Sequence, residues 1–209
     1  MKTSSSNLIR WCGLAYVIGG LSLIIQQLLH PASPEAAGAW VAVHSLGYFG
    51  LVFGLLGLVG VYACQMEQVG RLGLIGFVMA FIGNGLTVGA AFLDSYVQPV
   101  LFVKAPDLVG FPPKDPALFA GPLGLVVLLS AVIVTIGFIL FGIATIRAGV
   151  LPRWAAVLII LSSWFGLAAV FSQLVFTIGA IVFGLGNAWL GFAVWSGQGE
   201  KAGQFNRAT

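Results

Sequence analysis

Two ionisable side chains, His44 and Asp94, stand in long apolar stretches of the chain. Ionisable groups inside apolar spans are often functional, because a buried charge is costly in a bilayer. An imidazole changes charge near neutral pH, and a carboxylate can share its proton, so such a pair could handle a proton or bind a ligand. A purely structural hydrogen bond between two helices would need the same two residues. The sequence leaves both interpretations open, and it identifies no catalytic residue.

The spacing of small residues predicts that His44 and Asp94 face the inside of a helical bundle. His44 lies three residues before Gly47, the first of a series of glycines three or four apart, and Asp94 lies four residues after Ala90 on a similar series. Counted from Gln68, between two expected helices, His44 is 24 residues back and Asp94 is 26 residues forward. We therefore predict that the two side chains pair at one depth near the outer face.

Two amides and a second histidine complete the candidate residues. Asn84 and Asn187 fall at mid-depth in expected spans, where amides join helices by hydrogen bonds and could also line a polar substrate site. His30 and His44 lie at equal distances from Ala37, so both could contribute to a metal or haem site. No third ligand stands at helical spacing from them, and we predict no metal and no cofactor.

The composition indicates a membrane protein. Only 7% of the 209 residues are charged, whereas 59% are hydrophobic. So few charges cannot cover the surface of a soluble domain, but lipid tails accept apolar surface directly. The basic residues are scattered singly, so nucleic-acid binding is not expected, and the sequence contains no nucleophile elbow and no phosphate-binding loop. The expected partners are the lipid bilayer and either a membrane protein or a lipophilic ligand.

The uncharged runs between charges predict six membrane spans. About 20 helical residues cross a hydrocarbon core, so most of these runs hold one span each. The run from Arg153 to Glu200 encloses 46 uncharged residues and must fold back, most plausibly at the polar pair Ser172-Gln173. We predict one all-α domain over residues 1–209, a polytopic transmembrane helical bundle. Its spans are expected near residues 8–29, 39–64, 72–94, 118–146, 154–170 and 174–195.

The basic residues predict that both termini are cytoplasmic. Cytoplasmic loops of membrane proteins are enriched in Lys and Arg, and an N-in, C-in arrangement places seven of the nine basic residues on that side. They are Lys2, Arg10, Arg71, Arg147, Arg153, Lys201 and Arg207. Trp11, Trp154 and Trp195 would then form an aromatic belt at the inner boundary, with Trp40 at the outer one.

Glycine is abundant because, in membranes, small residues let helices pack closely. The chain has 29 glycines, and those of the second and third expected spans recur three or four residues apart. We therefore expect that enlarging Gly54 or Gly83 disrupts helix packing. Serine and threonine residues such as Ser130, Thr135 and Ser163 are expected to bond back to their own helices.

Several short motifs resemble those of bacterial multi-pass membrane proteins of the domain-of-unknown-function type. The motifs are His30-Pro31, Trp40 with His44, the Gly57-Leu58-Val59-Gly60 run before Tyr62, and the segment from Ala144 to Trp154. The resemblance implies a multi-pass protein of a bacterial-type inner membrane, and it implies no activity and no functional residue.

Three classes of function remain open. The first expectation is a non-catalytic accessory or assembly component of the membrane, because the sequence is rich in packing motifs and poor in sites. The alternatives are a carrier or channel for a small or lipophilic molecule, and an intramembrane enzyme that uses His44 and Asp94. A cavity that reaches His44 would favour the alternatives.

Overall fold

The computed structural model describes residues 5–31, 37–106, 121–168 and 172–198, and every element in these ranges is helical. The elements are α1 (Ser5–Leu28), α2 (Ala37–Ala63), α3 (Gly70–Phe92), the π-helical segment η1 (Leu93–Val97), α4 (Gln98–Lys104), α6 (Pro122–Ala148), α7 (Arg153–Ser162), α8 (Phe165–Ala168) and α9 (Gln173–Trp195). The described residues contain no strand, in agreement with the predicted all-α class.

Five of these helical segments are long and apolar enough to cross a membrane, judged by length and composition. They are α1, α2, α3 with its continuation through η1 and α4, α6, and α9. Their bounds lie within a few residues of the prediction except in the third. That helix was expected to end near residue 94 and runs on to Lys104, because the π-helical turns of η1 connect α3 to α4 without a break.

The segment predicted as the span 154–170 is shorter and broken within its described part. Helix α7 has 10 residues, about 15 Å of rise, which is half the thickness of a hydrocarbon core. The hydroxyl groups of Ser162 and Ser163 donate to Leu158 and Ile160 of the preceding turn. Thr135 of α6 donates to the Ser163 carbonyl at 3.1 Å, so Thr135 fixes the end of α7 and does not bond back to its own helix.

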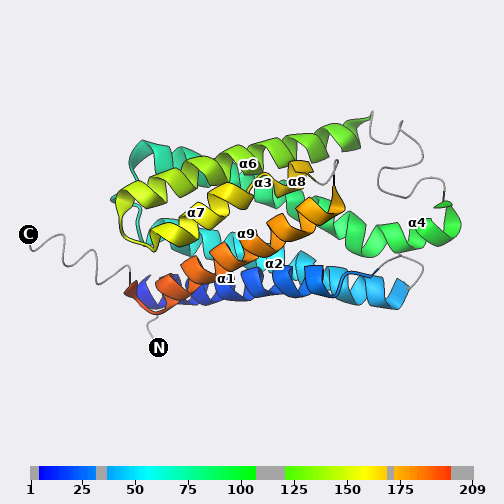
Figure 1. Ribbon diagram of the computed structural model, residues 1–209, viewed down its shortest axis with the longest axis horizontal. Coiled ribbons are helices and arrows are strands. Elements are labelled where there is room, and N and C mark those ends of the chain that lie inside the picture. Colours follow the sequence, from blue (N-terminus) through cyan, green and yellow to red (C-terminus); the bar gives the residue numbers. More distant parts are fainter. Residues whose placement is uncertain (1–4, 32–36, 107–120, 169–171, 199–209) are drawn as a thin grey trace, which may run out of the picture.

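Figure 1 shows the helices in two groups along one long axis. Helix α1 packs against both α2 and α9, α3 packs against α6, and α7 lies between α6 and α9. Glycine makes these contacts close. A methyl group added at Gly20 would collide with the backbone of Gly184, and one at Gly76 would collide with the backbone of Phe141. Small residues thus allow close packing mainly between α1 and α2, between α1 and α9, and between α3 and α6.

The bundle exposes large apolar side chains and buries small and polar ones, the reverse of a soluble protein. Large side chains such as Leu74, Ile75 and Leu125 are exposed, whereas the buried positions of α2 and α3 are mostly glycine with polar His44 and Asn84 among them. A membrane-embedded helical bundle has this arrangement because lipid solvates large aliphatic side chains and small residues favour helix contacts.

The arginines of the described chain gather at one end of the bundle, called here the arginine end. The Nε atom of Arg10 donates to the carbonyl of Trp195 at 2.8 Å, so the start of α1 and the end of α9 meet there (Figure 1). Arg71 begins α3, and Arg147 and Arg153 flank the turn from α6 to α7 at the same end. The opposite end, which carries His30 and His44, is called the histidine end.

A glycine and a proline make the tight turn between α6 and α7. Gly149 has a φ of +65°, a left-handed conformation that caps the helix and that other residues adopt at a cost. Pro152 then precedes α7. The side chains of Val150 and Leu151 are buried, so this turn is anchored to the core of the bundle.

Candidate functional site

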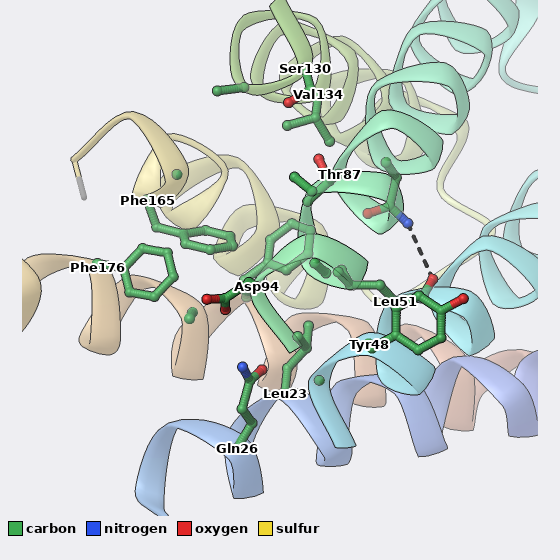
Figure 2. Close-up of a pocket in the computed structure, with 18 of the residues that line it drawn as sticks. Leu23, Gln26, Tyr48, Leu51, Thr87, Asp94, Ser130, Val134, Phe165 and Phe176 are labelled. Atoms are coloured by element: carbon green, nitrogen blue, oxygen red, sulfur yellow. Dashed lines mark hydrogen bonds between the residues drawn. The ribbon is translucent and has the colours of Figure 1, made fainter. Parts of the chain in front are cut away.

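A cavity of about 300 Å³ lies in the histidine half of the bundle, between the two groups of helices (Figure 2). Residues of α1, α2, α3, η1, α6, α8 and α9 line it. The cavity lies beside the end of α7, because Ser163, Phe165 and Gly166, which follow α7 in the chain, are among its lining residues. Its volume is at the lower end of the range for small-molecule sites, about 300–1,000 Å³. His44, Asp94 and Asn84 all line this cavity.

The structure brings His44 and Asp94 together. The Nε2 atom of His44 lies 3.3 Å from Oδ2 of Asp94. The His44 side chain is only 2% exposed and that of Asp94 is 43% exposed, so the carboxyl group forms the accessible side of the pair. The pair lies at the histidine end, at the depth that counting from Gln68 predicted.

The hydrogen bonds around His44 define how the pair is protonated. Nδ1 of His44 lies 3.0 Å from the carbonyl oxygen of Trp40, and a carbonyl can only accept, so Nδ1 carries a hydrogen. A neutral imidazole with hydrogen on Nδ1 has a lone pair on Nε2. A hydrogen bond from Nε2 to Asp94 therefore needs one further proton, either on His44 or on Asp94. In both forms the pair as a whole is neutral and holds one shared proton.

The π-helical segment η1 and a proline position Asp94. The N–H of Gln98 bonds five residues back to the carbonyl of Leu93, and the next residue, Pro99, has no N–H to donate to Asp94. The Asp94 carbonyl accepts instead from Nε1 of Trp40 at 2.9 Å. Trp40 thus connects α2 to η1 through one hydrogen bond, and its ring stacks on His44 at 4.0 Å between centroids. Trp40 is buried, so its ring packs inside the bundle, whereas the sequence analysis placed it in an aromatic belt at the outer boundary.

His30 belongs to the same aromatic cluster. Its ring lies 5.5 Å from Trp40 and 4.9 Å from His44, centroid to centroid. Its Nδ1 atom donates to the Pro31 carbonyl at 2.9 Å. Partial desolvation, with a smaller contribution from His44, holds the pKa of His30 below its usual value. Among the described residues no group of three or more His, Cys, Asp or Glu side chains could hold a metal ion.

The two candidate amides have different surroundings. Asn84 lines the cavity, and its Nδ2 atom makes a long hydrogen bond of 3.5 Å to the carbonyl of Leu51 (Figure 2). Asn187 of α9 is buried, its Oδ1 atom has no hydrogen-bond partner, and it does not line the cavity. Of the five candidate residues, His44, Asp94 and Asn84 therefore line one cavity, and His30 and Asn187 do not line it.

Two glutamines at the end of α1 are site residues that the sequence analysis missed. Gln26 and Gln27 both line the cavity, and Oε1 of Gln27 is buried without a hydrogen-bond partner on a side chain that is 8% exposed. An unpaired buried acceptor is unfavourable unless something else satisfies it. The available signal was the sequence itself, because two successive amides, four and three residues before His30, stand out in an apolar span.

Aromatic rings cover one wall of the cavity. Phe165 of α8 lies 5.4 Å from Phe176 and 5.4 Å from Phe183, and Phe183 lies 4.8 Å from Phe138, all between ring centroids. In Figure 2 the Asp94 carboxyl group points toward this wall, with Phe165 and Phe176 close to it in the view. Asp94 and these phenylalanines therefore line the same cavity.

The hydroxyl groups in the cavity wall direct their hydrogens away from it. Thr87 donates to Gly83 at 2.9 Å, and Ser130 donates to Val127 at 2.7 Å, each within its own helix. Their oxygen atoms remain as acceptors, as expected for hydroxyls that bond back to helical carbonyls. No Lys or Arg is found among the described residues that line the cavity. The site combines one carboxyl group, several neutral acceptors and an aromatic wall.

No family model, no curated protein and no solved structure matches this chain. The function has to be argued from the chemistry of the site.

Proposed function

We propose that this protein is a six-span membrane protein that binds and carries a small lipophilic molecule in the cavity beside His44 and Asp94. The observation that carries the proposal is the lining of that cavity. A mostly apolar wall with a few converging polar groups, His44, Asp94, Asn84 and the unpaired Gln27, is the usual composition of a small-molecule site.

The other two classes of function explain fewer of these features. An accessory or assembly component has no evident need for a cavity with an unsatisfied amide in its wall, although that role stays a prediction from the sequence. An enzyme would need a group that attacks or transfers, and among the described lining residues only the His44–Asp94 pair is available for proton transfer. Reversible binding of a ligand needs no group beyond the described residues that line the cavity.

The proposed topology places the arginine end in the cytoplasm. Arg10, Arg71, Arg147 and Arg153 gather at that end, and Lys104, the single lysine among the described residues, lies at the other. The positive-inside rule then orients both termini inward. The fifth crossing is proposed to run through α7 and α8. The sixth is proposed to be α9, which begins at Gln173, where Ser172 caps the helix by accepting from Val175.

Binding of small amphiphiles to the purified protein in lipid nanodiscs tests the proposed function. The probes are octanol, octanoate and octyltrimethylammonium, measured by equilibrium dialysis. The variant Ala131→Phe places a ring in the cavity, so that any remaining uptake reports partition of the probe into the lipid alone. The control Ala42→Phe makes the same substitution on an exposed face of α2. We expect saturable binding of at least one probe to the wild type and to Ala42→Phe, and its loss in Ala131→Phe. Equal, unsaturable uptake by all three proteins would contradict a ligand cavity.

A further inference from the structure

We infer that the ligand is a lipophilic organic cation, and that its binding releases the proton shared by His44 and Asp94. This inference rests on the proposed binding function and specifies its ligand class and its coupling to protons.

The charges around the cavity favour a cation. Asp94 is the only acidic residue among the described lining residues, and no basic residue other than His44 accompanies it. The neighbouring elements add no permanent charge among their described cavity-facing residues. Helix α1 contributes Gln26 and Gln27, α2 contributes Tyr48 besides His44, and α6, α8 and α9 contribute no titratable group. His30, beyond the end of α1, is neutral at neutral pH because its pKa is lowered.

The neutral polar groups favour a positively polarised ligand as well. Oε1 of Gln27 is a buried acceptor without a donor. Thr87 and Ser130 present oxygen atoms because their hydrogens bond to helix carbonyls. An anionic head group would meet these acceptors and the Asp94 carboxyl group without any Lys or Arg among the described lining residues, so it would be repelled.

The aromatic wall supplies the other half of a cation site. The negative faces of Phe, Tyr and Trp rings attract ammonium groups, most strongly where water is excluded. Phe165 contacts both Phe176 and Phe183, and all three rings line the cavity that Asp94 also lines. In Figure 2 the Asp94 carboxyl group lies near Phe165 and Phe176 in the view. A quaternary ammonium with a short alkyl chain could place its charge between Asp94 and these rings and its chain among the apolar lining residues.

Neutrality of the buried site couples the cation to the proton. Without ligand, the pair holds one proton and has no net charge. When a cation binds beside the Asp94 carboxylate, the shared proton leaves for solvent, His44 keeps hydrogen on Nδ1 alone, and the site is again neutral. Retaining both the proton and the cation would leave a net positive charge in a low-dielectric cavity, and losing both would leave a net negative one, and each is costly. The site therefore holds one proton or one organic cation.

Two measurements with octyltrimethylammonium test the inference. This probe has no titratable group, so any pH dependence belongs to the protein. Over the pH range in which the pair holds its proton, we expect the affinity to rise about tenfold for each unit of pH, because one proton is released per cation bound. In weakly buffered nanodiscs, a pH indicator dye should register that release. Octanol should bind without proton release, and octanoate should bind more weakly than both.

Two matched variants distinguish the effect of the Asp94 carboxyl group on binding from the effect of the protein's overall charge. Asp94→Asn should lower the affinity for octyltrimethylammonium at least tenfold and abolish the proton release, while octanol binding persists and shows that the cavity is intact. Glu67→Gln removes one carboxyl group at the exposed arginine end and should leave both properties unchanged.

The outcomes distinguish this inference from the proposed function. If no probe binds saturably, the ligand cavity itself is refuted. If octanol or octanoate binds at least as well as the cation, or if cation binding is independent of pH, the cavity stands and the inference of cation–proton exchange is overturned. Retained cation affinity in Asp94→Asn would overturn it too.

Discussion

At the scale of single residues, the site depends on a backbone carbonyl that cannot find a partner within its own helix. Pro99 lacks the N–H that the π-helical register would aim at Asp94, and Trp40 of a different helix supplies a donor. The same tryptophan stacks on His44, whose Nδ1 bonds to the Trp40 carbonyl. One residue thus positions both members of the acid–base pair.

Replacing Trp40 with phenylalanine should destabilise the protein by about 1–3 kcal/mol, because the Asp94 carbonyl would be left without a donor. Chemical unfolding in mixed micelles measures the change. The same substitution at the exposed Trp11 should have little effect. Pro99→Ala restores an N–H at the start of α4, five residues after Asp94, so the loss should be smaller when Trp40→Phe is made in that background. An equal loss in both backgrounds would show that the hydrogen bond is not what Trp40 contributes.

At Gln27, one substitution should raise the stability of the ligand-free protein and weaken its binding of the ligand. Its Oε1 atom is buried without a partner, so Gln27→Leu is expected to raise the free energy of unfolding of the ligand-free protein by about 1 kcal/mol while weakening ligand binding. Gln65 is the comparison, since its Oε1 atom is likewise buried without a partner but its Nε2 atom donates to Thr145 at 2.9 Å. Gln65→Leu should therefore be destabilising. A destabilising effect of Gln27→Leu would indicate that its amide serves the fold.

At the scale of elements, regular glycine spacing conceals glycines with different roles. Gly83 lies against the backbone of Val134 in α6, so a methyl group there has no space. Gly54 belongs to the equally regular series of α2, yet an added methyl group would meet only Asn84 at 3.7 Å, an ordinary contact. Gly85 and Gly89 have open space around them. The expectation that enlarging Gly54 or Gly83 disrupts packing therefore holds for Gly83 far more firmly than for a small change at Gly54.

A pair of alanine substitutions two residues apart tests this difference. Gly83→Ala should cost about 1–3 kcal/mol, because α3 and α6 must separate to admit the methyl group. Gly85→Ala should stabilise α3 by about 0.5–1 kcal/mol, because alanine has the higher helix propensity and nothing obstructs it. Thermal unfolding in detergent gives both values. Similar effects at the two sites would refute the close α3–α6 contact.

At the scale of the whole molecule, the cavity lies beside a helix that stops early. Helix α7 begins at the arginine end beside α6, ends at Ser162, and its C-cap Ser163 accepts a hydrogen bond from Thr135. Ser163 and the α8 residues Phe165 and Gly166 then line the cavity. A polytopic bundle with one broken helix can place polar backbone and side chains beside a cavity without exposing them to lipid.

Reporter fusions test the proposed topology. Reporters placed after Gln68 and after Gly149 should behave as cytoplasmic, because both turns lie at the arginine end. A reporter after Pro113 should behave as external. A reporter at the C-terminus should match the first two, since α9 ends beside the start of α1. An external signal from that last fusion is incompatible with six crossings.

The sequence by itself determined what depends on composition and period. Sparse charges and long apolar runs predicted an all-α bundle and the bounds of four long helices to within a few residues, because the bilayer requires helices of about 20 apolar residues whatever their neighbours are. Helical spacing and counting from one turn were enough to predict that His44 and Asp94 meet, since rise per residue is constant along a helix. The number of membrane crossings, five or six, was harder to predict from the sequence, because the helix breaks at Ser162-Ser163 within a run that composition presents as continuous.

Only the tertiary structure decided what depends on neighbours from distant segments. The cavity, the unpaired amide of Gln27 and the burial of Trp40 arise where five or more helices converge, and no period along one helix encodes them. Asn84 and Asn187 have the same side chain in similar apolar surroundings in the sequence, yet one lines the cavity and the other does not. Rotation and crossing of whole helices, set by the sum of their side-chain contacts, made that difference.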